Sequence, residues 1–89
     1  MTRAWEADPS AELVRRLGKS AAELGSTGGD SGCPDIWELD NGDIAVIGRD
    51  LTSAYESRLP ASVAIAADER LVIIPRIMIV TAKADIPDA

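Results

Sequence analysis

The chain contains no histidine and a single cysteine, Cys33. Without imidazole it cannot form Ser-His or Cys-His nucleophile pairs, and it lacks the commonest general base near neutral pH. A lone cysteine cannot close an internal disulfide, which argues against an oxidised, secreted scaffold. Cys33 is the one candidate nucleophile, but the neighbouring Asp35 carboxylate disfavours thiolate formation there.

Aromatic residues and long apolar runs are also scarce. The chain has no phenylalanine, and its aromatic residues are Trp5, Trp37 and Tyr55. Aliphatic side chains must therefore build the core, and the many Val and Ile residues of the second half favour a sheet. The longest apolar run, 71–80, is interrupted by Pro75 and Arg76 and is far shorter than the roughly 20 residues of a membrane helix. The first residues lack the apolar core of a signal peptide, so we expect a cytoplasmic protein.

Negative charge is the most pronounced feature that is present. Fifteen acids against nine bases give a net charge of −6, and residues 30–50 hold six of the acids and one base. Such a chain is a poor partner for nucleic acid or an anionic membrane. A localised acidic surface is instead suited to a basic protein, of which a DNA-binding regulator is one class. The expected partner-binding residues are Asp35, Trp37, Glu38, Asp40 and Asp43.

The same acidic stretch carries the clearest structural signal. Residues 36–39 and 43–47 flank the sequence Asp40-Asn41-Gly42, and Asn-Gly between apolar runs is typical of a β-hairpin. Residues 44–47 are apolar at every position, which indicates a strand that is central or covered on both faces.

An amphipathic helix is expected before the hairpin. Asp8-Pro9 suits a helix start, and five apolar residues follow at helical spacing: Leu13, Val14, Leu17, Ala21 and Leu24. Gly18 is a weak point, and Ser20 to Glu23 has the form of a capping box at which a helix can restart. We therefore predict a helix within 1–24, a glycine-rich tether over 25–34 and a core over 35–89, all in one domain. The tether would let the helix dock on its own chain or on a second protomer.

The second half of the sequence predicts short helices and strands. A short helix through about Arg58 should end before Pro60, and strands are expected at 63–65 and 71–74. Residues 76–84 fit either a strand or a helix, and we favour a strand. The predicted fold class is α+β: an N-terminal amphipathic helix plus a small, mainly antiparallel sheet of three to five strands. A chain of this length buries only about 60–65% of its unfolded surface, so a homodimer is favoured over a monomer.

Two resemblances accompany these patterns. Ile73-Ile74-Pro75-Arg76 resembles a fragment of the AbrB-type swapped-hairpin DNA-binding fold, although the acidic net charge departs from that family. Residues 33–52 together with 70–76 resemble small uncharacterised acidic proteins of actinomycetes, a resemblance that implies no activity for any residue.

The sequence favours a non-enzymatic accessory or regulatory module that presents the acidic hairpin to a basic partner. No cofactor or metal is expected, because the carboxylate spacing does not match an EF-hand and is explained by turn chemistry. One alternative is a small enzyme or ligand-binding protein that uses carboxylates and Cys33, which would need a pocket with converging polar groups. The other is a small DNA-binding dimer that uses basic side chains, namely Arg15, Arg16, Lys19 and Arg76.

Overall fold

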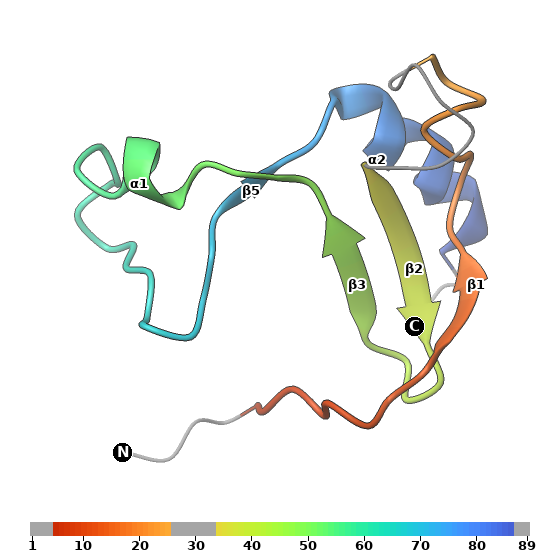
Figure 1. The fold of residues 1–89 in the computed structure, drawn as a ribbon, viewed down its shortest axis with the longest axis horizontal. Coiled ribbons are helices and arrows are strands. Elements are labelled where there is room, and N and C mark those ends of the chain that lie inside the picture. The colour runs from red at the N-terminus through yellow and green to blue at the C-terminus, as the bar shows by residue number, and fades with distance from the viewer. Residues whose placement is uncertain (1–4, 26–33, 87–89) are drawn as a thin grey trace.

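The computed structural model describes residues 5–25 and 34–86. Three strands, β1 (Leu13–Arg16), β2 (Asp35–Leu39) and β3 (Ile44–Ile47), form an antiparallel sheet in the order β1-β2-β3 (Figure 1). Two further strands, β4 (Arg49–Asp50) and β5 (Val72–Ile73), form a separate antiparallel pair. The described helices are short: α1 (Thr52–Tyr55), α2 (Arg76–Ala82) and the 3-10 turn η1 (Lys83–Asp85). The prediction of a small, mainly antiparallel sheet structure is confirmed.

The predicted N-terminal helix is wrong within the described residues. Residues 13–16 form strand β1, and Leu13 and Val14 are more than half exposed. Gly18 ends the extended segment with a φ of +77°, after which residues 21–25 form turns. The capping box does form, because Ser20 and Glu23 exchange side-chain-to-backbone hydrogen bonds of 3.0 and 3.2 Å. Non-local pairing with β2 thus overrides the local helical spacing. Most of the predicted tether, 26–33, lies outside the described residues.

The hairpin prediction is confirmed. β2 and β3 pair antiparallel with Glu38 opposite Ile44, and the turn between them comprises residues 40–42. The Gly42 amide donates to the Leu39 carbonyl at 3.0 Å, and Gly42 has a φ of +90°. This is the three-residue loop in which a glycine takes the left-handed position, and Asn41 keeps a negative φ.

The position of β3 differs from expectation. β2 is the central strand and β3 lies at an edge of the sheet. Its three large side chains are 41–50% exposed: Ile44, Val46 and Ile47. The two-sided apolar sequence of β3 therefore remains uncovered in the single chain, because α2 packs over β2 rather than over β3.

The elements after β3 are only partly as predicted. α1 is a short helix that ends well before Pro60, and β5 occupies the middle of the expected strand 71–74. Residues 63–65 form no strand, and residues 76–82 form a helix rather than the favoured strand. Pro75 precedes α2 with φ −64° and ψ 146°, and a proline at a helix start loses no hydrogen bond. The β-branched residues of α2 favour a strand by intrinsic propensity, so the sequence pattern did not favour this helix.

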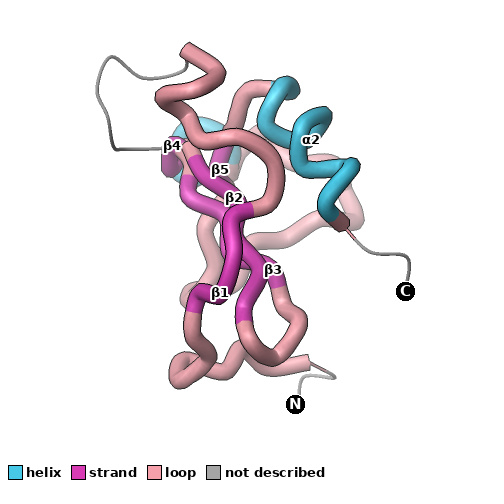
Figure 2. Tube along the Cα trace, turned by 90° about the vertical axis from the view of Figure 1, so that its right-hand side faces the viewer, coloured by secondary structure: helices cyan, strands magenta, loops and turns pink. Residues whose placement is uncertain are grey.

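The core is a small cluster between the sheet and α2. Figure 2 shows α2 beside the β1-β2-β3 sheet, and the buried cluster joins Leu17, Ile36, Met78 and Ala82, with Leu24 and Ile74 packed against it. Met78 and Ala82 are four residues apart and so share one face of α2. The core therefore depends on a few contacts between residues 17–24, β2 and α2.

Gly18 lies against the C-terminal part of α2. A Cβ at Gly18 would lie 2.6 Å from the Ala82 amide nitrogen and 2.7 Å from the Thr81 hydroxyl. The Gly18 amide also donates to the Asp85 carboxylate at 2.7 Å. Only glycine combines the positive φ with this close approach.

We expect Gly18→Ala to lower the free energy of unfolding by about 2–4 kcal/mol, because backbone strain and a clash with α2 act together. Urea unfolding measures the change. Gly42→Ala is the matched control: Gly42 also has a positive φ, but a Cβ there meets no atom within 4 Å. The control should lose only about 1 kcal/mol, and equal losses would contradict the packing role of Gly18.

Candidate functional site

The two arginines of β1 neutralise carboxylates of β2. Arg16 donates from Nε to Asp35 Oδ1 at 2.8 Å and from Nη2 to Asp35 Oδ2 at 3.1 Å. The Arg16 guanidinium also lies 4.8 Å from the centre of the Trp37 ring, on which it makes a cation–π contact. Asp35 is buried, so this bidentate pair is a structural element of the sheet.

Arg15 performs the same role on Glu38. Its Nε donates to Glu38 Oε1 at 2.8 Å, and its Nη2 donates to the backbone carbonyl of Asp85. The register places Arg15 opposite Glu38 and Arg16 opposite Trp37, with a bulge between Leu13 and Arg15. Three of the five expected partner-binding residues, Asp35, Trp37 and Glu38, thus contact an arginine of β1.

Asp40 and Asp43 lie instead at the tip of the hairpin. Asp40 Oδ1 accepts from the Glu12 amide at 3.3 Å, and Asp43 Oδ2 accepts from Trp5 Nε1 at 3.3 Å. The Asp40 amide also donates to the Glu12 carbonyl at 2.9 Å, so the segment before β1 runs along the hairpin tip. Neither carboxylate forms an ion pair with a residue that the structure describes.

This juxtaposition creates a local excess of negative charge. Residues 5–12 and 39–48 together contain five acids and no lysine or arginine. We call this set the acidic end: it consists of Glu6, Asp8, Glu12, Asp40 and Asp43. All are exposed except Asp43, which is half-buried. The Ser10 hydroxyl and amide both donate to Asp8 and lower the pKa of its carboxyl.

The sequence did not indicate the contribution of residues 5–16 to this site. The helical spacing of this segment predicts instead a helix that carries Glu12, Arg15 and Arg16. A signal was nevertheless present: two adjacent bases in LVRR can oppose the acids of DIWEL when the two segments run antiparallel. Cys33, the candidate nucleophile, lies outside the described residues.

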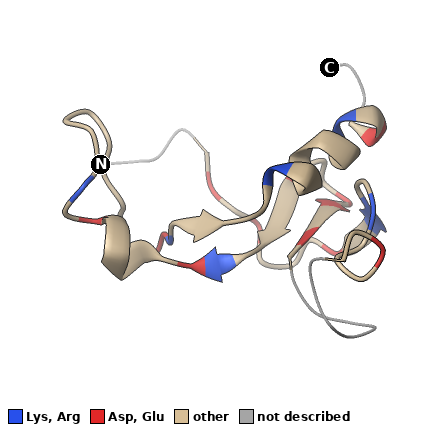
Figure 3. Ribbon diagram, turned by 90° about the horizontal axis from the view of Figure 1, so that it is seen from above, with Lys and Arg blue, Asp and Glu red and all other residues tan. Residues whose placement is uncertain are grey.

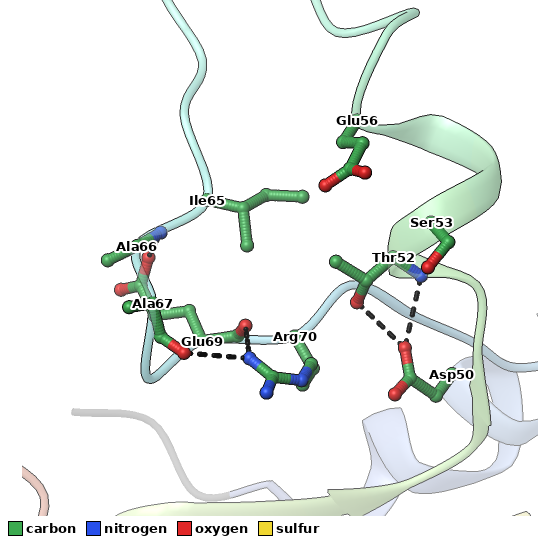
Figure 4. A pocket seen from close by; sticks show the side chains of 9 residues that line it. All are labelled: Asp50, Thr52, Ser53, Glu56, Ile65, Ala66, Ala67, Glu69 and Arg70. Carbon is green, nitrogen blue, oxygen red and sulfur yellow. Dashed lines mark hydrogen bonds between the residues drawn. The ribbon is translucent and has the colours of Figure 1, made fainter.

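A separate hollow lies between α1 and the turn before β5. It has a volume of about 390 Å³ and is lined by residues of 50–56 and 65–70 (Figure 4). Several of its polar groups have local partners: Thr52 donates to Asp50 Oδ1, and Arg70 Nη1 donates to the carbonyls of Ala67 and Glu69. These are turn interactions and do not converge on a common ligand position.

The described residues contain no group of three or more metal-ligating side chains placed to hold an ion. The longest described helix, α2, has seven residues, so no helix in that part of the chain reaches the length and apolarity that crossing a bilayer requires.

Comparison with known proteins adds no relative. No family model, no curated protein and no solved structure matches the chain.

We expect the Arg16–Asp35 pair to make stability depend on pH. Hydrogen bonding to Arg16 lowers the pKa of Asp35, so the stabilisation is present above the ordinary aspartate pKa and is lost as the pH falls through the lowered folded-state pKa. Asp35→Asn should cost about 1–2 kcal/mol at neutral pH, because it removes a charge-assisted bidentate pair. The difference from wild type should shrink as the pH falls below the ordinary aspartate pKa. Chemical denaturation at neutral and acid pH tests this, and a difference that stays constant with pH would contradict it.

Proposed function

We propose that this chain is a non-enzymatic, cytoplasmic protein-interaction module that presents its acidic end to a basic protein partner. The observation that carries the proposal is the division of the hairpin carboxylates. Asp35 and Glu38 pair with Arg16 and Arg15, whereas the exposed Asp40 and the half-buried Asp43 have no cation partner among the described residues. Negative charge that no described cation neutralises is available to an external basic group.

The residues of the hairpin then have two roles. Asp35, Trp37 and Glu38 hold β2 against β1 and fix the position of the tip. Asp40 and Asp43 contact the partner, together with the neighbouring carboxylates of Glu6, Asp8 and Glu12. Such a surface accelerates encounter with a basic partner and selects among partners, and its effect weakens with salt. A DNA-binding regulator is one protein class with a suitable basic surface.

The proposal is tested by removing charge without changing shape. Asp40→Asn/Asp43→Asn keeps one oxygen acceptor in each side chain and removes two negative charges. Glu56→Gln/Glu69→Gln removes the same charge from residues remote from the acidic end and serves as the control. Both variants and the wild type are immobilised, exposed to a lysate of the source cell and eluted with a salt gradient.

A basic protein should elute from the wild type and the control with rising salt, and the acidic-end variant should retain little of it. With that protein purified, we expect about a tenfold lower association rate for the acidic-end variant at low salt. Equal retention by all three proteins, or no retention by any, would refute the proposal.

A further inference from the structure

The outward face of α2 is apolar and uncovered. Met78 and Ala82 face the core, and Ile77, Ile79 and Val80 are 43%, 53% and 54% exposed. Charged residues occur only before and after this stretch, so the middle of α2 carries none (Figure 3). A surface helix of a monomer normally shows charged or polar residues on its outer face.

The sheet continues this uncovered face. Val46 is paired with Ile36 across the two strands, and directly paired side chains lie on the same face of a sheet. Ile36 is buried against Met78 of α2, so Val46 lies on the α2 side of the sheet yet remains 41% exposed. Ile44 lies on the same face, two residues along β3. The outer side chains of α2 and this face of β3 together form what we call the open face.

A long segment projects from this region without a core of its own. Residues 49–73, which we call the arm, contain β4, α1 and β5, and none of its residues is buried. The arm extends away from the β1-β2-β3 sheet (Figure 1), and the radius of gyration is 14.6 Å against about 12 Å for a compact domain of this length. It exposes further aliphatic side chains: Leu51, Val63, Val72 and Ile73.

The base of the arm is closely packed in spite of this exposure. A Cβ at Gly48 would lie 2.6 Å from the Ile73 carbonyl oxygen, so the chain entering the arm presses against the chain leaving it. β4 and β5 pair in register there, with Arg49 opposite Ile73 and Asp50 opposite Val72. The arm is thus attached through a defined two-stranded base.

The exposed apolar area and the local net charge indicate what kind of molecule covers the open face. Nine aliphatic side chains of the open face and the arm are each 38–54% exposed. They leave several hundred Å² of apolar surface, the same order as the roughly 800 Å² that each partner contributes to a standard interface. Residues 44–82 contain four acids and four bases, whereas the net charge of −6 resides elsewhere in the chain. Two identical surfaces of zero net charge can meet without the repulsion that the acidic end would cause.

We propose that a second copy of this chain covers the open face, with the two copies related by a two-fold axis and the arm of each packed on the other. A two-fold interface uses the same patch on both subunits. The apolar arm of each copy can therefore cover the open face of the other copy. The dimer supplies the cover that β3 and α2 lack and a core for the arm.

The experiment is sedimentation equilibrium of the full chain from low to several hundred micromolar, with two variants. Val80→Glu places a charge in the open face, and Val14→Glu places the same charge on β1, outside the open face, at a side chain of equal exposure (53% against 54%). We expect wild type and Val14→Glu to reach twice the 9.4 kDa chain mass. Val80→Glu should raise the dimer dissociation constant about 100-fold, because a charge would be buried unpaired.

A monomeric wild type over the whole range overturns the proposal, as does a Val80→Glu protein that dimerises like the wild type. If Val80→Glu loses its far-UV circular dichroism, amide hydrogen exchange of the wild type decides between a monomer and a dimer. Exchange within residues 49–73 and 76–82 must slow as the concentration rises, and exchange that does not depend on concentration overturns the dimer.

The dimer is independent of the basic partner. Asp40→Asn/Asp43→Asn should dimerise as the wild type does, because the acidic end lies outside the open face. A monomeric wild type that still captures a basic protein in a salt-sensitive way would overturn the dimer and leave the proposed function standing. A dimeric wild type that captures no basic protein would overturn the proposed function and leave the dimer standing.

Discussion

The pairing of β1 with β2 is the interaction on which the rest of the structure depends. Arg15 and Arg16 meet Glu38 and Asp35 across the two strands, and this charge complementarity sets a register that the exposed aliphatic residues of β1 could not specify. Once β1 is fixed, Leu17 enters the core and Gly18 meets the end of α2. The core, the site of α2 and the position of the hairpin tip all follow from this pairing.

The molecule has two surfaces of opposite character. The acidic end gathers carboxylates where the segment before β1 meets the hairpin tip, and it lies away from α2 and the arm. The open face and the arm are aliphatic and carry equal numbers of acids and bases. Separation of the two surfaces allows self-association to proceed while the charged end stays in solvent, so one small chain can hold two kinds of contact at once.

The hairpin was predictable because its signal is local. Asp40-Asn41-Gly42 supplies the turn residues, and the apolar runs on either side supply the strands. β1 was not predictable from local pattern, because its strand pairing needs Asp35 and Glu38, about twenty residues away along the chain. The prediction of a strand where α2 forms failed for a related reason. The β-branched residues of α2 favour a strand on intrinsic grounds, and a helix forms because Met78 and Ala82 pack on the core.

The candidate site was predictable in part for the same physical reason. Asp40 and Asp43 follow from the turn chemistry, but the neutralisation of Asp35 and Glu38 and the addition of Glu12 depend on where the segment before β1 lies in space. A count of charges along the sequence therefore includes Asp35 and Glu38, which arginines neutralise. The same count omits Glu12, which adds its negative charge at the hairpin tip.

The contacts of Asp85 have a consequence for how the chain folds. Its carbonyl accepts from Arg15 and its carboxylate from the Gly18 amide, across separations of 70 and 67 residues. Closing loops of this length is entropically costly and slow. During synthesis β1 cannot acquire these contacts until residue 85 has left the ribosome, whereas the β2–β3 hairpin can form much earlier. Folding should thus begin at the acidic hairpin and finish by joining the two ends of the described chain.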